Sequence, residues 1–160
     1  MKVRPSESEV KDFCLKVAQH LPLETGDDSL IVLKGHLLCE EYINEYLREV
    51  LSHAEHLEKA KLPMTTKITL CKAASDDERH DKWIWKGVEK LNSLRNSYAH
   101  ALVPNQDTVS KRKESFITYV QQQNLPRIPL IEANKLALNI VLLCTAIYSV
   151  LGVLQNEQTQ

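Results

Sequence analysis

The sequence predicts an all-α protein, a single-domain bundle of five to six helices. The chain has 160 residues, a length typical of one domain. Apolar residues make up 43% of it and charged residues 26%, a balance that allows a buried core and excludes a disordered chain. Four glycines and six prolines are too few for the many turns of a β-sandwich. We expect one helical domain over residues 1–154 and a disordered tail at residues 155–160.

The first expected helix begins at a capping box. Ser6 follows Pro5 and precedes Glu9 by three residues, so each side chain can accept a hydrogen bond from the other residue's backbone N–H. An apolar face follows at helical spacing, made up of Val10, Phe13, Cys14 and Val17. This helix should end near Pro22.

Residues 30–59 form the longest expected helix, and its apolar face changes along its length. Leu30, Leu33 and Leu37 lie on one side at its start. Tyr46, Val50 and Leu57 lie on nearly the opposite side further on. Such a change indicates either a break in the helix or packing between two neighbours, for example the core and a partner subunit.

Prolines and turn residues divide the rest of the chain. Pro63 precedes a short helix at residues 66–74, and acidic residues at 76–78 lead into a fourth helix at 81–103 that stops before Pro104. A turn-like linker at 103–110 separates it from a fifth helix at 111–123. Prolines 126 and 129 end that helix, and a sixth covers residues 130–154. We expect mostly antiparallel neighbours.

The last helix is apolar enough to require a test for a membrane span. Residues 136–156 carry no charge, and about 20 apolar residues cross a bilayer. Polar residues and Gly152 interrupt the stretch, and no basic cluster flanks it, which favours a core helix over a tail anchor. The N-terminus lacks the apolar segment of a secretory signal. Four scattered cysteines are typical of buried thiols in a reducing compartment, so we expect a cytoplasmic protein without a membrane partner.

The fourth helix contains the most informative pattern, LNSLRNSYAH at residues 91–100. One stripe is apolar, made up of Ile84, Val88, Leu91, Leu94, Tyr98 and Leu102. A second stripe is polar, made up of Asn92, Asn96 and His100. Arg95 projects from the apolar stripe, where a guanidinium is costly to bury alone. It either reaches solvent, or pairs with a carboxylate such as Glu41, or binds an anion in a cleft.

The run LRNSYAH resembles the Arg-x4–6-His signature of HEPN domains (higher eukaryotes and prokaryotes nucleotide-binding), with Asn96 as the polar residue after Arg95. The segment DSLIVLKGHLLCEEYINEYL resembles the long helix that precedes this motif in many members. The resemblance covers about residues 30–154. It implies metal-independent RNA cleavage, without a cofactor, in a homodimer whose two motif helices face each other across a basic cleft.

The resemblance assigns roles that suit these residue types. His100 would exchange a proton with the ribose 2′-OH, because histidine titrates near neutral pH. Arg95 would hold the phosphate and stabilise charge on its oxygens, and Asn96 would orient the histidine or the substrate. The products would carry a 2′,3′-cyclic phosphate and a 5′-hydroxyl. Candidate substrate-binding residues are Lys86, Lys90, Tyr98, Lys111 and Arg112.

Two features bear on the partners that the resemblance implies. Arg95 and His100 are five positions apart and diverge by about 140° on an ideal helix. A dimer that draws them from different subunits resolves this, as would the length of arginine or distortion at the helix end.

Toxin members with a nucleotidyltransferase antitoxin carry a tyrosine where this chain has Leu102. The expected partners are RNA, a second copy of the chain, and an antitoxin or other regulatory protein.

The alternative function is a non-catalytic helical module that dimerises or binds a partner protein or a nucleotide. A net charge of −1 favours this alternative, because an RNA cleft needs basic residues. His53 and His56 are spaced like metal ligands, but no third ligand has suitable spacing, so we expect no metal. Trp83 and Trp85 could stack on bases, although a core or interface role is favoured.

Overall fold

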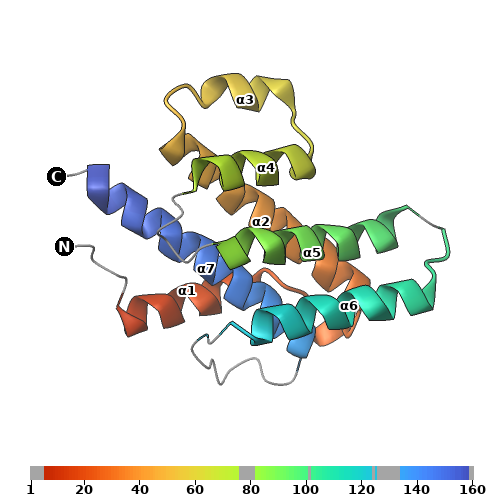
Figure 1. Ribbon diagram of the computed structural model, residues 1–160. Coiled ribbons are helices and arrows are strands. Elements are labelled where there is room, and N and C mark those ends of the chain that lie inside the picture. Colours follow the sequence, from red (N-terminus) through yellow and green to blue (C-terminus); the bar gives the residue numbers. More distant parts are fainter. Residues whose placement is uncertain (1–5, 76–81, 101, 124, 126–133, 159–160) are drawn as a thin grey trace.

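The computed structural model describes residues 6–75, 82–100, 102–123, 125 and 134–158 (Figure 1). These residues contain seven α-helices, one turn of 3₁₀ helix at Leu23–Thr25 and no β-strand. The helices are α1 (Glu7–Gln19), α2 (Asp28–Val50), α3 (Glu55–Ala60), α4 (Met64–Ala74), α5 (Lys82–Ala99), α6 (Gln106–Gln121) and α7 (Lys135–Gln158). The predicted all-α class is confirmed, with one helix more than the six expected.

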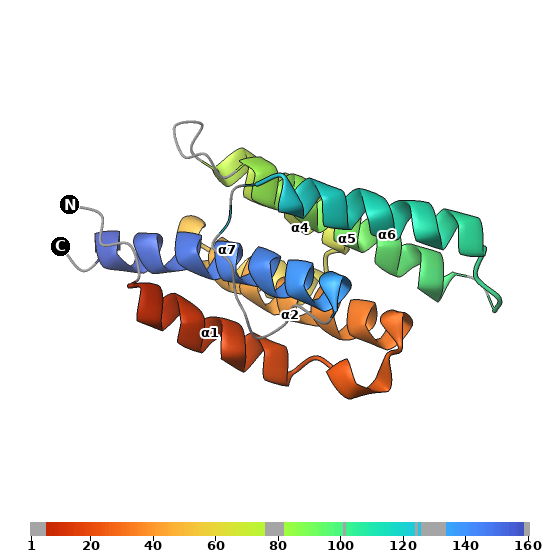
Figure 2. The ribbon, with the colours of Figure 1, turned by 90° about the horizontal axis from the view of Figure 1, so that it is seen from below.

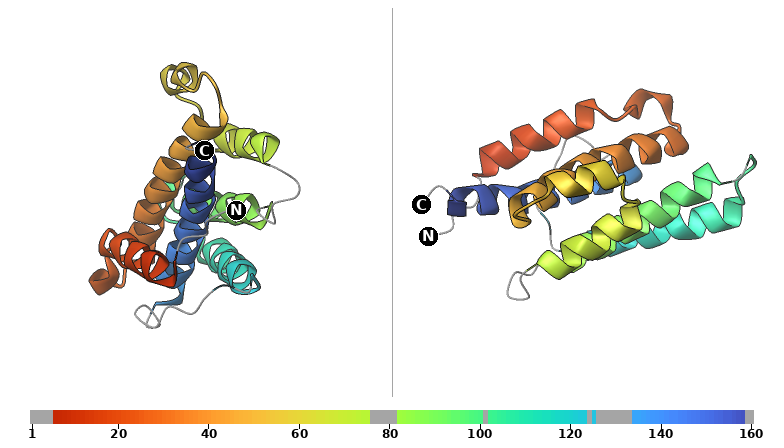
Figure 3. Two further views of the ribbon diagram at one scale, coloured as in Figure 1. Left: turned by 90° about the vertical axis from the view of Figure 1, so that its left-hand side faces the viewer. Right: turned by 90° about the horizontal axis from the view of Figure 1, so that it is seen from above.

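The helices form two layers, which are seen edge-on in Figure 2 and again in Figure 3. One layer contains α1, α2 and α7, and the other contains α4, α5 and α6. Helix α7 packs against α1, α2, α5 and α6, so it joins the layers. Helices α5 and α6 are antiparallel, but α2 and α7 run in the same direction (Figures 1 and 2). The expectation of antiparallel neighbours is therefore wrong for that pair.

The helix starts follow local capping chemistry. The capping box is confirmed: Ser6 Oγ accepts from the Glu9 amide at 3.3 Å, and Glu9 Oε2 accepts from the Ser6 amide at 2.7 Å. Asn105 caps α6 by accepting from the Thr108 amide at 3.0 Å. Helix α6 therefore begins at Gln106, and most of the predicted linker at 103–110 is helical. The acidic start signal at 76–78 and the prolines at 126 and 129 lie outside the described residues.

The helix expected over residues 30–59 is broken. Helix α2 ends at Val50, because Leu51 is extended at φ −113° and ψ 126°, and α3 begins only at Glu55. The predicted apolar face at the start of α2 is also wrong. Leu37 is 55% exposed, whereas Ile31 and Ile43 are fully buried. The change of apolar face therefore has an explanation within one chain and does not require a partner subunit.

Helix α7 is the core of the molecule. Its residues 135–152 have a mean hydropathy of 1.8 and could span a membrane by length and composition, and 56% of that stretch is buried inside the protein. Cys14 and Cys39 approach it from α1 and α2; Cys39 Sγ lies 3.4 Å from Cys144 Sγ. All four cysteines are buried and free, as expected. The helix continues to Gln158, beyond the end expected at residue 154.

Two glycines let both layers approach α7 closely. A Cβ on Gly35 of α2 would lie 2.6 Å from Ile140 Cγ2, and one on Gly87 of α5 would lie 2.9 Å from Leu143 Cδ1. Both partners are fully buried, so they have little room to move. The depth at which α2 and α5 pack on α7 therefore depends on these two positions.

This packing predicts opposite effects for two Gly→Ala substitutions. An alanine gains about 1 kcal/mol of helix propensity, but overpacking a core costs about 1–3 kcal/mol. Gly35→Ala should therefore lower the melting temperature, because Ile140 is β-branched and enclosed. Gly152→Ala on α7, which meets no atom within 4 Å, should raise it by about 2–4 °C. Thermal denaturation followed by circular dichroism compares the two, and an unchanged or higher melting temperature for Gly35→Ala would contradict the packing argument.

Candidate functional site

Helix α5 presents the predicted motif at its C-terminal end. The apolar stripe is confirmed over its first part, since Ile84, Val88, Leu91 and Leu94 are buried. Tyr98 is half-buried, and Leu102 is wholly exposed because the helix ends at Ala99 rather than at the expected Val103. His100 is the first residue beyond the helix; its amide still donates to the Asn96 carbonyl at 3.2 Å. The imidazole is thus exposed at a helix end.

Arg95 is half-buried and does not pair with Glu41. Its Nη1 donates to Asn96 Oδ1 at 3.2 Å. Glu41 lies on the exposed side of α2, so of the three alternatives for Arg95 the ion pair with Glu41 is not formed. In the described part of the chain no carboxylate forms an ion pair with the Arg95 guanidinium. Its charge is therefore available to the surroundings of Asn96.

The structure brings Asn96, His100 and Arg112 together in one groove. The groove has a volume of about 640 Å³ and runs between α4 and α5, with one residue contributed by α6. Its lining consists of Thr65, Ile68, Thr69, Glu89, Asn92, Ser93, Asn96, His100 and Arg112. Arg95 is not part of this lining, so the divergence of Arg95 and His100 persists within one chain.

Arg112 is the guanidinium that reaches the groove. Its Nη1 donates to the Ser93 carbonyl at 3.0 Å and to Ser97 Oγ at 2.7 Å, which fixes it across α5. Its Nε and Nη2 form no hydrogen bond with the described residues. These free N–H groups suit a phosphate, because a guanidinium can bind two of its oxygens at once.

Asn92 links the two layers at the floor of the groove. It is 8% exposed, and its Oδ1 lies 2.9 Å from Nε2 of His36 on α2. An amide oxygen can only accept, so the His36 proton is on Nε2. Burial is the largest influence on His36 and lowers its pKa, and the charges of Arg95 and Lys67 lower it further. The hydrogen bond to Asn92 and the charge of Glu40 raise the pKa, but the net shift is downward.

The other predicted binding residues are dispersed. Lys90 donates to Ser115 Oγ at 2.7 Å and, with the exposed Lys111, lines a separate hollow between α5 and α6. Lys86 forms an ion pair with Glu89 at 3.1 Å, at the edge of the groove. Tyr98 lies outside the groove and packs against the core. Only Arg112 of this predicted set lines the groove.

Charge is divided between the two layers, which the net charge conceals. Helices α4, α5 and α6 carry nine basic and three acidic residues, whereas α1, α2 and α7 carry five basic and nine acidic residues. The groove therefore lies in a layer with a net charge of +6 in a chain with a net charge of −1. Four of the nine basic residues of this layer form ion pairs, namely Lys67, Lys72, Lys86 and Lys113.

Several groove residues were missed from the sequence. Thr65 and Thr69 come from α4, and only the tertiary packing of α4 on α5 brings them to His100. Glu89 was also missed, and it accepts from Lys72 of α4 as well as from Lys86. Burial is the largest single influence on Glu89 and raises its pKa. The two lysines together outweigh burial, so the pKa of Glu89 lies below its usual value. The charge division could have been found by counting charges helix by helix.

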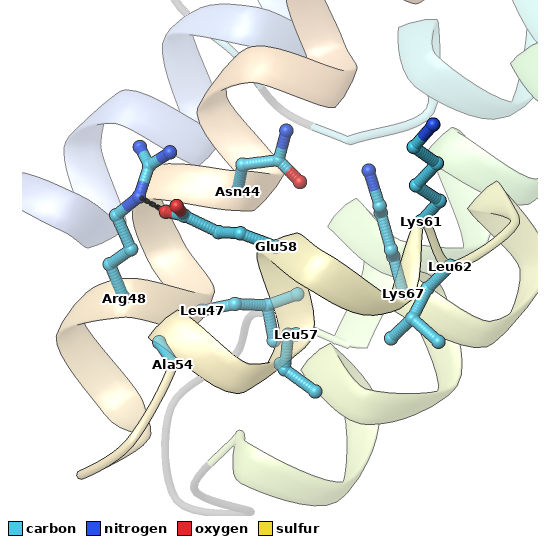
Figure 4. Close-up of a pocket in the computed structure, with 9 residues that line it drawn as sticks. All are labelled: Asn44, Leu47, Arg48, Ala54, Leu57, Glu58, Lys61, Leu62 and Lys67. Carbon is cyan, nitrogen blue, oxygen red and sulfur yellow. Dashed lines mark hydrogen bonds and ion pairs between the residues drawn. The ribbon is translucent and has the colours of Figure 1, made fainter.

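A smaller pocket of about 260 Å³ lies between α2, α3 and α4 (Figure 4). Arg48 Nε donates to Glu58 Oε1 at 2.6 Å on one side of it. The amino groups of Lys61 and Lys67 point in a similar direction in the close-up, but Lys67 pairs with Glu40 at 2.7 Å. Much of the positive charge around this pocket is therefore balanced within the protein, and no predicted site residue lines it.

The remaining sequence candidates lie elsewhere. Trp85 is buried against Tyr46 and donates to Ser75 Oγ at 2.6 Å, which confirms the core interpretation for this tryptophan. His53 and His56 are exposed on either side of Glu55, at 3.4 and 3.8 Å from its Oε1. No group of three His, Cys, Asp or Glu side chains suited to a metal occurs among the described residues.

The buried His36 predicts a pH dependence of stability. Its pKa in the folded state lies below the ordinary value of 6.5, so the unfolded chain binds the proton first as pH falls. Stability should be intact above pH 6.5 and fall below it, by at most about 1.4 kcal/mol per pH unit from this group. His36→Gln, which cannot titrate, should show a smaller drop in melting temperature between pH 7 and pH 5. His56→Gln, at a side chain that is 76% exposed, serves as the control; equal drops in both variants would contradict the assignment.

The candidate site is thus a groove in the basic layer, with His100 at one end and Asn92 in its floor. Comparison of the chain with protein-family models, curated proteins and solved structures finds no match. What the site can do is therefore argued from the geometry of its own residues.

Proposed function

We propose that the protein is a metal-independent endoribonuclease of the HEPN type that acts as a homodimer and binds RNA in this groove. The observation that carries the proposal is the position of His100, Asn96 and Arg112 in one groove of the basic layer. The motif Arg-Asn-x3-His contributes two of these three residues. The locally positive field attracts a polyanion, even though the whole chain is slightly acidic.

The proposed reaction is an internal displacement at phosphorus. His100 removes the proton of the ribose 2′-OH, and the 2′-oxygen forms a bond to the adjacent phosphorus. The bond from phosphorus to the 5′-oxygen breaks, and that oxygen takes a proton from a water molecule and leaves as a 5′-hydroxyl, while the proton on His100 returns to solvent. Arg112 binds the non-bridging oxygens, where negative charge increases in the transition state. The other product carries a 2′,3′-cyclic phosphate.

Dimerisation is the second part of the proposal. Leu102 and Val103, directly after the motif, are 102% and 80% exposed. Adjacent exposed apolar side chains are suited to a protein interface, and this pair lies close in sequence to His100. A partner subunit docked here would bring its own motif helix near the groove, and its Arg95 could supply the second cation. The same surface is where an antitoxin or other regulatory protein would block access.

The alternative is a non-catalytic helical module that binds a partner protein or a nucleotide. It is favoured by the place of Arg95, which lies outside the groove that contains His100. The two functions differ in the result of a cleavage assay, since the module would bind without producing a cyclic phosphate.

The nuclease proposal predicts cleavage of single-stranded RNA that EDTA does not inhibit. An all-deoxy strand of the same sequence should stay intact, because it lacks the attacking 2′-OH.

His100→Ala should lower the rate by about 10²–10⁴-fold, the usual contribution of a general acid–base group. Arg112→Ala should lower it by at least about tenfold, whereas the control Lys111→Ala, on the same helix but outside the groove, should have little effect. End-labelled RNA and mapping of the product termini provide the measurement; a wild type that is inactive on every RNA, or is inhibited by EDTA, would refute the proposal.

The dimer proposal predicts a light-scattering mass of about twice the 18.3 kDa of the chain. Leu102→Asp should shift the protein toward the monomer, because it places a charge in the proposed interface. Leu37→Asp is the matched control, since Leu37 is 55% exposed on α2 and lies outside the proposed interface. A monomeric wild type at micromolar concentration, or equal dissociation by both variants, would rule out this interface.

A further inference from the structure

The hollow between α5 and α6 contains an aromatic ring that the core does not use. The hollow has a volume of about 450 Å³, and Tyr119 lines it together with Lys90 and Ser115. Tyr119 is half-buried, and among the described residues it is not one of the partly buried apolar side chains that pack against the core. An aromatic ring at an open hollow is a surface on which a flat ligand can stack.

Lys90 holds a positive charge beside this ring. Its Nζ lies 5.3 Å from the centroid of the Tyr119 ring and donates to Ser115 Oγ at 2.7 Å. Within the described part of the chain no carboxylate forms an ion pair with Lys90. An ammonium group has more donors than this one bond uses, so donors remain for a ligand. The hollow thus combines a ring suited to a base with a cation suited to a phosphate.

This end of the hollow adjoins the groove. Arg112, Ser115 and Tyr119 follow one another at i, i+3 and i+7 on α6, so they share one face of that helix. Burial raises the pKa of Tyr119, and the nearby charges of Lys86 and Glu89 also act on it, in opposite directions. Because Glu89 lines the groove, a ligand that leaves the groove along α6 arrives at Tyr119.

We propose that Tyr119 and Lys90 form a second nucleotide subsite, which binds a base and a phosphate of the same RNA strand that enters the groove. The inference rests on the proposed RNA-binding function and adds a site away from the cleaved bond. Tyr119 stacks on the base, and Lys90 binds the adjacent phosphate. Every base has a π-face, so this subsite contributes affinity without selecting a sequence.

The separation of Tyr119 from Arg112 determines which nucleotide is bound there. Seven residues of α6 correspond to about 10 Å along the helix. A stacked strand advances about 3.4 Å per phosphate, so the base on Tyr119 lies about three nucleotides from the cleaved bond. Such a base must be unpaired, which restricts the substrate to single strands. Lys111 lies at the other end of the hollow, about 12 Å from Tyr119 along α6, and does not contact a base stacked there.

The test measures binding without cleavage. In a His100→Ala background, fluorescence anisotropy gives the dissociation constant of an end-labelled ten-residue oligouridylate. Tyr119→Ala should raise this constant at least about fivefold, the lower end of what the loss of one stacked base costs. Tyr119→Phe keeps the ring and should bind within about twofold of the parent, whereas Tyr119→Leu keeps only apolar bulk and should behave like the alanine variant. Tyr148→Ala, at an exposed tyrosine of α7, is the control and should leave the constant unchanged.

Two further readouts separate a contact with RNA from an effect on folding. Lys90→Met should reduce the slope of log affinity against log salt concentration by about 0.7, the value for one phosphate of a single strand, and Tyr119→Ala should leave that slope unchanged. With 5-iodouracil in the oligonucleotide, irradiation should join the RNA to the tryptic peptide of residues 114–127, in which Tyr119 and the buried Phe116 are the aromatic residues. The cross-link should disappear in Tyr119→Leu. Melting temperatures establish that each variant is folded.

The outcomes are distinguishable from those of the proposed function. An unchanged dissociation constant in Tyr119→Ala, an equal loss in Tyr119→Phe, or a cross-link confined to other peptides overturns the subsite even if the wild type cleaves RNA. Binding that depends on the Tyr119 ring in a protein without cleavage supports the subsite and refutes the nuclease. Failure of the oligonucleotide to bind overturns both.

Discussion

The close packing of α2 and α5 on neighbouring positions of α7 is the constraint on which the rest of the structure depends. Gly35 and Gly87 remove side chains at the two contact points, where Ile140 and Leu143 occupy the space. Helix α7 lies in the layer of α1 and α2 and also packs against α5 and α6 of the other layer (Figure 2). The distance between the layers is then fixed, and this distance allows His36 of α2 to reach Asn92 of α5 at 2.9 Å. Core packing thus sets the geometry of a polar contact at the floor of the groove.

The two layers also separate charge in a way that matters for function. A chain with near-equal numbers of basic and acidic residues has little net field at long range. Here the acidic residues concentrate on α1 and α2 of one layer, and the basic residues on α4, α5 and α6 of the other. The α4–α6 layer therefore has an excess of basic residues and the other layer an excess of acidic residues, and the ion pairs Lys67–Glu40 and Lys113–Asp28 join the two. The groove that contains His100 and Arg112 lies in the layer with the excess of basic residues.

Much of the fold followed from periodicity and capping, and the failures have identifiable causes. Ser6 and Glu9 predicted the start of α1 correctly, because a capping box is a local signal. The start of α6 was placed too late, since the cap at Asn105 was read as part of a turn. The break after Val50 has no proline or glycine at Leu51 to mark it, so only tertiary contacts could decide between the alternatives.

The site was predictable in part. Asn96 and His100 follow from helical spacing on α5, and both line the groove. Arg95 was expected beside them but lies off the groove, because five positions on a helix do not bring two side chains to one face. Arg112 was proposed only as one of several cations, and its role depends on the packing of α6 across α5, which no local pattern encodes. Long-range contacts of this kind determine the site, and a single sequence does not reveal them.

The hydrogen-bonding polarity of the groove gives Arg95 a role despite its position. Asn96 Oδ1 accepts from Arg95 as Asn92 Oδ1 accepts from His36, so both amide oxygens are used within the protein. The N–H groups of both asparagines remain without hydrogen bonds to the described residues, as do Nε and Nη2 of Arg112. The groove therefore presents donors at three successive points, and a ligand rich in acceptors satisfies them best. A phosphodiester strand has acceptors at every phosphate, ribose and base. In this arrangement Arg95 contacts the groove only through its hydrogen bond to Asn96 Oδ1, and its guanidinium does not line the groove.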